Sequence, residues 1–388
     1  MSRRSVVVAT IVLALTLAGC SGGPGGDVDA RPVDAVVADG EPDPIDAATD
    51  AGLDAPTDAA VDAPDEEALP ALAGGLATLS GASTAGNYDG ARGFARFSNP
   101  VNVVSDGAGG ALVCDFDNGR IRHVSADGAV TTPITVPSTF ARPFGVVRDG
   151  DTLFVQTDRS TVGTNTGALW RITLSTGTTA LVRDGFGRYR GLGLLADGRL
   201  VGVEYLQHVV SVIDRDTGVA TVLAGAAGQP GNVDDTGAAA RFRQPWDVVV
   251  LPGDELVISD LGNHTLRRVT AAGVVTTWVG DGTAGGDDGT GAAARFNGPQ
   301  GLAVDGDGNV YVSDPENANV RRVTPAGVVT TIAGTGTPGY LDAADPLTGQ
   351  LFGLEGLDLS ADGAYLFIAD GSRGEANPHH RVRRLSLP

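Results

Sequence analysis

The chain has 388 residues, with 27 Lys+Arg against 47 Asp+Glu, so its formal net charge is −20. This acidity argues against a nucleic-acid partner, because nucleic-acid binders need clusters of basic side chains to displace counterions from phosphates. Every cation is an arginine, which excludes catalytic lysine chemistry, and two cysteines cannot form a disulfide framework. The 57 glycines indicate many tight turns and favour an all-β fold.

Residues 1–19 have the pattern of a secretory signal peptide. Arg3 and Arg4 precede an apolar run, 6–17, that is too short to span a bilayer comfortably. The run ends in Leu-Ala-Gly-Cys at 17–20, which resembles the bacterial lipobox. The resemblance implies cleavage before Cys20 and acylation of that cysteine, for example with palmitate, which would attach the mature protein to a membrane. We therefore expect a lipid-anchored, extracytoplasmic protein of the cell envelope, in the outer membrane or at the cell surface. The alternative is an ordinary secretory peptide with an incidental cysteine.

Residues 20–73 predict a disordered acidic tether that follows the lipidated cysteine. Between residues 21 and 72 there are eleven Asp, three Glu and seven Pro, but one Arg. Five of the aspartates recur every four residues from Asp46 to Asp62, so a helix would bring like charges together. Too little apolar surface is present to offset the entropy lost on folding. A weak calcium-binding tract is the alternative, but calcium prefers a preformed cage of oxygens.

From residue 74 to residue 388 the chain repeats one unit at intervals of about 50 residues. The clearest unit, 296–334, contains four β-type runs, at 301–304, 309–313, 320–324 and 328–333. Each of the six units can be aligned on one residue at its start: Pro100, Pro143, Gly191, Pro245, Pro299 and Leu354. A four-stranded unit cannot bury both of its faces alone. Packing six such sheets around an axis solves this, which is a β-propeller.

The repeat resembles the NHL family in three motifs. Pro-x-Gly-Leu-Ala-Val-Asp opens the unit at Pro299, Tyr-Val-Ser-Asp-x-x-Asn ends at Asn317, and Val-Arg-Arg-Val follows at 320–323. The match is clear in the units at Pro100, Pro245 and Pro299, recognisable at Leu354, and weak in the other two. The resemblance implies an all-β, six-bladed propeller of the NHL type. Some NHL proteins bind RNA, but the negative net charge and the predicted extracytoplasmic location of this chain argue against RNA binding.

The two ends of this region predict how the propeller closes. The sixth unit stops at Pro388, after its third β-type run, whereas 77–81 matches the end of a fourth run, 331–334. We therefore expect an N-terminal strand to complete the last blade as a clasp. This makes 74–388 one domain, which we expect to be monomeric.

Charged and nucleophilic side chains recur at fixed positions of the repeat. Arginines at one strand position could form a basic ring, but their fixed register with one aspartate per unit favours buried pairing. The pairs are Arg122, Arg267, Arg321 and Arg383 with Asp115, Asp260, Asp314 and Asp370.

Three histidines align with one another in the repeat: His208, His264 and His380. Three histidines can hold zinc, yet equivalent loops of different blades diverge, so we expect no shared zinc site. Cys114 is expected to be a small buried filler. Acidic loops around Asp234, Asp288 and Asp342 are expected to attract cations to one face.

The mouth of the central channel is the expected ligand site. At the starts of the innermost runs, a few residues differ from the apolar or glycine residues of the other units: Asn102, Trp246, Asp247, Gln300 and Glu355. Oxygens of Asn102, Asp247 and Glu355 could hold Ca²⁺ or another divalent cation, although no cofactor is clearly indicated. Ordinary variation at a solvent-filled mouth is the alternative.

These patterns favour a non-catalytic, membrane-anchored scaffold that binds a protein, peptide or glycan, because no catalytic set is assembled. The alternative is a metal-dependent hydrolase or lyase with its site in the channel. The NHL-like amidating lyases and the SMP-30-type lactonases are propeller enzymes of this kind, and a resemblance to them would imply such a site. The channel histidines of the former and the metal motif of the latter have no counterpart in this sequence.

Overall fold

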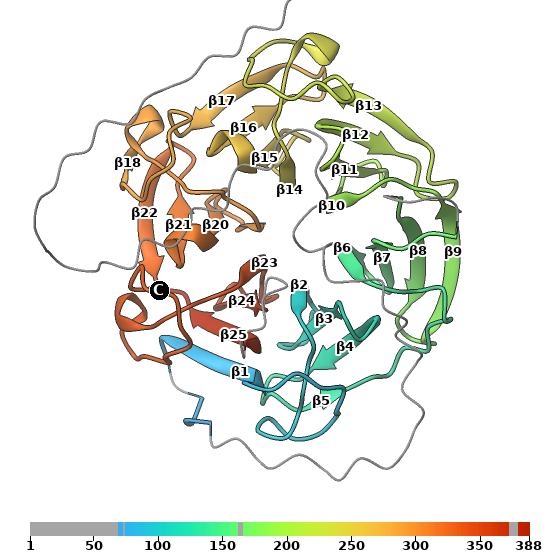
Figure 1. Ribbon diagram of the computed structural model, residues 1–388, viewed down its shortest axis with the longest axis vertical. Coiled ribbons are helices and arrows are strands. Elements are labelled where there is room, and N and C mark those ends of the chain that lie inside the picture. Colours follow the sequence, from blue (N-terminus) through green and yellow to red (C-terminus); the bar gives the residue numbers. More distant parts are fainter. Residues whose placement is uncertain (1–68, 73, 162–165, 372–378) are drawn as a thin grey trace, which may run out of the picture. The chain divides into compact units, whose positions relative to one another are not determined.

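The computed structural model describes residues 69–72, 74–161, 166–371 and 379–388. The predicted signal peptide, Cys20 and nearly all of the predicted tether lie outside these residues. The described chain forms short antiparallel strands in six sheets, which stand around one axis (Figure 1). None of its helices is long and apolar enough to cross a membrane. The prediction of an all-β, six-bladed propeller is confirmed.

Each blade is a meander whose first strand lies nearest the axis (Figure 1). The first blade contains β2 (Pro100–Ser105), β3 (Ala111–Asp115), β4 (Arg120–Val124) and β5 (Val130–Thr131). The second contains β6 (Pro143–Asp149), β7 (Thr152–Thr157), β8 (Ala168–Thr173) and β9 (Thr178–Asp184). The third contains β10 (Tyr189–Leu194), β11 (Leu200–Glu204), β12 (Val209–Ile213) and β13 (Ala220–Ala224).

The fourth and fifth blades come from the two clearest sequence units. The fourth contains β14 (Pro245–Val250), β15 (Leu256–Asp260), β16 (Thr265–Val269) and β17 (Val275–Val279). The fifth contains β19 (Leu302–Val304), β20 (Val310–Asp314), β21 (Asn319–Val323) and β22 (Val328–Ala333), with the short β18 (Gly289–Thr290) beside β22. Single 3-10 turns occur in the connections: η1 (Gly237–Ala239), η2 (Leu261–Asn263), η3 (Gly291–Ala293), η4 (Pro315–Asn317) and η5 (Pro346–Thr348). The four runs predicted for the fifth blade agree with its strands to within one residue.

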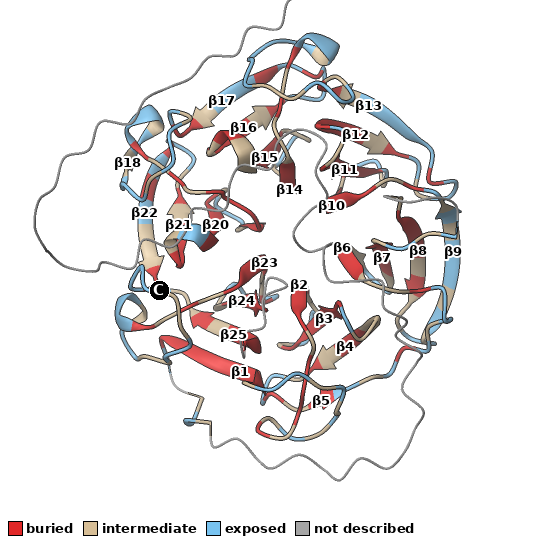
Figure 2. Ribbon diagram, in the orientation of Figure 1, coloured by how far each residue is buried: buried red, intermediate tan, exposed pale blue. Residues whose placement is uncertain are grey.

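The sixth blade joins the two ends of the folded region. Its sheet runs outward from β23 (Leu354–Leu359) through β24 (Tyr365–Asp370) and β25 (His380–Ser386) to β1 (Leu76–Ala82). Leu76 lies opposite Leu385, and Ala82 lies opposite His380, in an antiparallel pair. Every residue of β1 is buried, whereas the outermost strands β9 and β13 are largely exposed (Figure 2). The predicted N-terminal clasp is confirmed.

The hydrophobic core is divided into six clusters: five lie between two neighbouring blades, and the sixth extends from the first blade to the fourth. Phe296, for example, is fully buried among side chains of the fourth and fifth blades, and Phe97 is fully buried between the sixth and the first. Each blade therefore depends on the blades beside it to bury its faces. This dependence explains why closure of the ring matters for the stability of every blade.

The strand register of the third blade shows that the alignment of its sequence unit on Gly191 is wrong. Tyr189 pairs with Glu204 in the way that Pro245 pairs with Asp260, so Tyr189 and not Gly191 begins the innermost strand. The error arose because the blade lacks the usual proline, and its Gly-Leu-Gly-Leu run fits the repeat in two registers two residues apart. In the correct register, Gly191 is equivalent to Asp247.

Candidate functional site in the central channel

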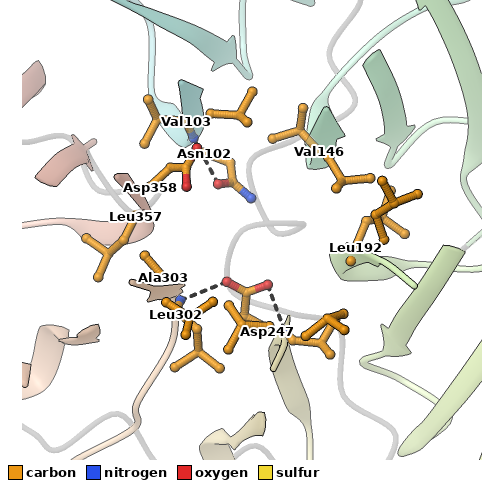
Figure 3. Close-up of a pocket in the computed structure, with 17 residues that line it drawn as sticks. Asn102, Val103, Val146, Leu192, Asp247, Leu302, Ala303, Leu357 and Asp358 are labelled. Carbon is orange, nitrogen blue, oxygen red and sulfur yellow. Dashed lines mark hydrogen bonds between the residues drawn. The ribbon is translucent and has the colours of Figure 1, made fainter. Parts of the chain in front are cut away.

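The innermost strands of all six blades enclose a cavity of about 230 Å³. Its wall consists mainly of valine, leucine, alanine and glycine. Three polar side chains interrupt this apolar wall: Asn102 on β2, Asp247 on β14 and Asp358 on β23 (Figure 3). The side chains of the wall are therefore mostly apolar with a small number of polar groups, which is the usual composition of a small-molecule site.

Asp247 joins the fourth blade to the fifth. Its Oδ1 accepts a hydrogen bond from the backbone N–H of Val248 (2.8 Å), and its Oδ2 accepts one from the N–H of Leu302 on β19 (2.8 Å). Burial raises the pKa of the carboxyl to about 7, and the nearby negative charge of Asp358 acts in the same direction. Asp247 is therefore poised to gain or lose a proton near neutral pH.

Asp358 joins the sixth blade to the first in a similar way. Its Oδ2 accepts a hydrogen bond from the N–H of Ser105 on β2 (2.7 Å). Burial raises the pKa of this carboxyl to about 6, although the positive charge of Arg148 opposes the shift. Asp358 is not among the channel residues predicted from the sequence. Comparing the units at that position would have found it, because the other five blades carry valine, alanine or glycine there: Val104, Val147, Gly193, Val249 and Ala303.

Asn102 lies on the first blade, and its side chain is directed to the cavity (Figure 3). The residue is 9% exposed, and its Oδ1 accepts a hydrogen bond from the N–H of Val103 (2.8 Å). A Cβ added at Gly356 would lie 2.1 Å from that oxygen, and one added at Gly191 would lie 2.3 Å from Oδ1 of Asp247. These glycines are therefore needed to make room for the polar side chains of the neighbouring blades.

The structure separates the five sequence-predicted channel residues into two groups. Asn102 and Asp247 line the cavity, whereas Trp246, Gln300 and Glu355 are buried beside it and do not form its wall. The three oxygen donors proposed for a cation thus do not all face one chamber, because Glu355 is absent from the lining. Among the described residues no group of three His, Cys, Asp or Glu side chains is close enough to hold a metal ion. Whether any of the five binds a ligand stays a prediction.

The recurring arginines are structural, as predicted. Arg321 is fully buried and contacts Asp314 (3.0 Å) and the loop residue Asp288 (2.7 Å), which in turn accepts hydrogen bonds from the N–H and hydroxyl of Thr331. We call this arrangement the arginine latch. It recurs as Arg122 with Asp115 and Asp89, Arg267 with Asp260 and Asp234, and Arg383 with Asp370 and Asp342. Asp234, Asp288 and Asp342 are each paired with a latch arginine, and whether their loops attract cations stays a prediction.

The three aligned histidines each fasten one blade to the next. The backbone N–H of Gln244 donates to Nδ1 of His208, that of Gly298 to His264, and that of Asn99 to His380, at 3.0–3.1 Å. Such an acceptor must be unprotonated, and burial lowers the pKa of His264 and lowers that of His380 to about 4. The histidines lie at three different junctions between blades, as expected, and form no common metal site among the described residues.

Cys114 is an unreactive core residue. It is 1% exposed, and burial raises the pKa of its thiol far above the ordinary value, with the negative charge of Asp115 adding to the effect. A buried thiol of this kind has no access to a substrate and little thiolate character. The prediction that Cys114 fills space in the core is confirmed.

Comparison with known proteins agrees with this architecture. The NHL repeat model matches residues 242–268 and 296–322, in the fourth and fifth blades. A stretch of 88 residues, 22% of the chain, is 36% identical to NHL repeat-containing protein 2 of Gallus gallus, and it spans about 12% of the length of that protein.

Two solved structures share the fold over most of the chain. One is a protein of unknown function from Bacteroides thetaiotaomicron, with a TM-score of 0.64 and 20% identity over 80% of this chain and 75% of that one. Another is an auxiliary nutrient binding protein from the same species, with a TM-score of 0.63 and 18% identity over the same shares of the two chains. The described part of the chain is therefore a six-bladed β-propeller, in which residues 242–268 and 296–322 match the NHL repeat.

Proposed function

We propose that this chain is an envelope-anchored binding protein whose propeller takes a small ligand, or the end of a peptide or glycan chain, into its central cavity. The observation that carries the proposal is the chamber itself, where Asn102, Asp247 and Asp358 face an apolar space of about 230 Å³. This volume lies just below the range of roughly 300–1,000 Å³ typical of small-molecule sites. A whole folded partner cannot enter it.

Two further observations support binding in place of catalysis. Cys114, the one cysteine among the described residues, is buried and unreactive, so it offers no nucleophile. The histidines at the blade junctions use Nδ1 to accept backbone hydrogen bonds, and none of the three lines the cavity. One of the solved propellers of similar fold is described as a nutrient binding protein, which is compatible with the same role here.

A block of the chamber tests the proposal. Val104 lines the cavity, and Val104→Phe would fill much of its space. We expect compounds from a library of small metabolites to raise the unfolding temperature of the wild-type 74–388 domain but not of Val104→Phe. A ligand at 100 times its Kd stabilises the folded state by about 2.7 kcal/mol, which is measurable as a shift of several degrees.

The matched control is Val222→Phe. Val222 is 50% exposed on the outermost strand β13, so the same substitution there leaves the chamber open. We expect this variant to respond to ligands as the wild type does. Ligands that stabilise Val104→Phe equally well, or a library in which no compound discriminates between the variants, would contradict binding in the cavity.

A metal-dependent hydrolase is the second candidate, and one observation favours it. The pKa of Asp247 is raised to about 7, which is the range in which a carboxylate serves well as a general base. Elemental analysis of the purified 74–388 domain separates the two functions. A stoichiometric divalent metal that is lost in Asp247→Asn would favour the hydrolase, whereas a metal-free domain that still binds ligand would favour the binding protein.

Membrane attachment depends on the predicted lipobox. Cys20→Ser removes the thiol that would be acylated, so we expect loss of fatty-acid labelling and release of the protein from the membrane fraction. The measurement is fractionation of cells that express the full chain, with palmitate labelling. Cys114→Ser is the matched control, because that thiol is buried in the first blade and its loss should leave attachment unchanged. Unchanged membrane retention of Cys20→Ser would contradict the anchor.

A further inference from the structure

The two carboxylates of the channel cavity, which are partly exposed to it, differ from the buried aspartates of the blades. Fully buried aspartates elsewhere each contact an arginine at 2.5–3.0 Å; they are Asp115, Asp158, Asp260, Asp314 and Asp370. In the described part of the chain, neither Asp247 nor Asp358 has an arginine, a histidine or any other cation within 4 Å. Two carboxylates without a cationic partner beside one space give the cavity a negative potential when they are ionised, which favours a positively charged ligand.

Asn102 gives a second, independent indication of a ligand. Its side chain is more than nine-tenths buried, and its Oδ1 is already occupied by the N–H of Val103. The amide nitrogen faces the cavity in Figure 3, and no described residue accepts a hydrogen bond from it. An amide N–H₂ in this position is available to donate a hydrogen bond into the cavity. A ligand oxygen placed in the chamber would supply it.

The remaining wall decides between a metal ion and an organic cation. Ca²⁺ takes six to eight oxygen ligands, but both oxygens of Asp247 and one of Asp358 already accept backbone hydrogen bonds. Most of the wall is aliphatic, for example Val103, Val146 and Leu192 (Figure 3). These side chains suit a hydrocarbon body and offer a metal ion no further side-chain ligands.

We infer that the channel cavity binds a small aliphatic ammonium compound that also carries an oxygen acceptor, with Asp247 and Asp358 facing the ammonium group and Asn102 donating to the oxygen. This inference rests on the proposed function, whose cavity it uses. One further charged group influences the two acids: the positive charge of Arg148 on β6 lowers the pKa of Asp358. The ammonium group supplies the positive charge that the two carboxylates lack, and the aliphatic chain contacts the apolar wall.

Three probes of equal size test the inference by isothermal calorimetry on the 74–388 domain at pH 8. 5-Amino-1-pentanol has both groups, 1,5-pentanediol lacks the ammonium, and n-hexylamine lacks the oxygen. We expect 5-amino-1-pentanol to bind at least tenfold more tightly than the diol and several-fold more tightly than hexylamine. Asp358→Asn should weaken binding of 5-amino-1-pentanol at least tenfold, because the negative charge is lost. The amide oxygen of asparagine can still accept the hydrogen bond from the N–H of Ser105.

The control for charge is Asp216→Asn. Asp216 is 72% exposed and pairs with Arg171 on the outside of the blades, so the substitution removes the same charge without touching the cavity. Binding should be unchanged. The pKa values of about 7 and 6 for Asp247 and Asp358 also predict a pH profile, because protonation of both acids below pH 6 removes the attraction. We expect affinity for the amino alcohol to fall at least tenfold between pH 8 and pH 5, and affinity for the diol to stay constant.

The outcomes separate this inference from the proposed function. Equal binding of the diol and the amino alcohol, or Ca²⁺ binding that is lost in Asp247→Asn while no amine binds, overturns the ammonium inference. A neutral metabolite whose binding is lost in Val104→Phe overturns it as well, but upholds the cavity as a binding site. If neither the probes nor the library discriminates between wild type and Val104→Phe, both proposals fail.

Discussion

Deletion of residues 74–81 is expected to lower the unfolding temperature of the propeller by at least about 10 °C, or to prevent soluble expression altogether. The deletion removes most of β1, including Leu76 and Leu79, which are 1% and 0% exposed. Burial of each leucine contributes about 1.5–3 kcal/mol, and the ladder to β25 is lost as well. It also uncovers the edge of β25, so the sixth blade can no longer close the ring.

A pair of point variants tests the same strand without changing chain length. Leu79→Ala in β1 should cost about 2–5 kcal/mol, because it leaves a cavity in a fully buried position. Leu181→Ala makes the same change in the outermost strand β9, where the side chain is 50% exposed, and should cost less than about 0.5 kcal/mol. Thermal unfolding followed by circular dichroism measures both. Equal effects of the two variants would mean that β1 is an ordinary exposed edge and not a clasp.

The clasp shows why so much of the fold could be predicted from one sequence. The repeat supplies several internal copies of each structural position, so a strand missing at Pro388 and a surplus strand at 77–81 are visible as a mismatch. The arginine latch was predictable for the same reason, since one arginine and one aspartate keep a fixed register in four units. Both predictions depend on residue types that recur at equivalent positions of the repeat. These residue types recur because each blade makes the same contacts with its neighbours.

The cavity could be predicted only in part, because it depends on where the repeat departs from its own pattern. Asn102 and Asp247 stood out against glycines, but Asp358 occupies an ordinary apolar position and was missed. Trp246, Gln300 and Glu355 lie one residue from the glycine position and prove to be buried beside the chamber. The wall includes consecutive strand residues such as Val248, Val249 and Val250, so the alternation of a strand does not by itself show which residues reach the cavity.

The latches and the histidine contacts hold the blades and their loops together in one closed ring. The latch of the fifth blade ties the loop before it to its outer strand, since Asp288 contacts both Arg321 and Thr331. The histidines tie the blades to one another, as His264 does with Gly298. The second blade lacks this latch arginine. There Asp158 contacts Arg188 and Arg190 of the third blade, and the Arg190 guanidinium stacks on Phe144 at 4.1 Å.

Arg321→Met is expected to destabilise the propeller by about 3–5 kcal/mol, the effect of removing one partner from a buried ion pair. The substitution leaves Asp314, whose side chain is fully buried, without a cation. It also removes the hydrogen bonds that the guanidinium donates to the carbonyls of Arg295 and Asp287 at 3.0 Å. Denaturant unfolding at pH 8 measures the loss. Arg295→Met is the matched control, because Arg295 is 41% exposed and its surface ion pairs should contribute less than about 1 kcal/mol.

The double variant Arg321→Met/Asp314→Asn distinguishes an uncompensated charge from simple loss of packing. Asparagine keeps an oxygen for the N–H of Asn297, which Asp314 binds at 2.8 Å, but it carries no charge. The double variant should therefore be more stable than Arg321→Met alone. The pH dependence has a matching sign: burial raises the pKa of Asp314 to about 6, above its unfolded value, so protonation between about pH 6 and pH 4 stabilises the folded state. Arg321 lowers this pKa, so the variant binds the proton at a higher pH than the wild type does, and the deficit of Arg321→Met should shrink as the pH falls from 8 to about 6 and then stay constant. A deficit that is equal at pH 8 and pH 5, with a double variant less stable than the single one, would show that the latch acts through packing and not through charge.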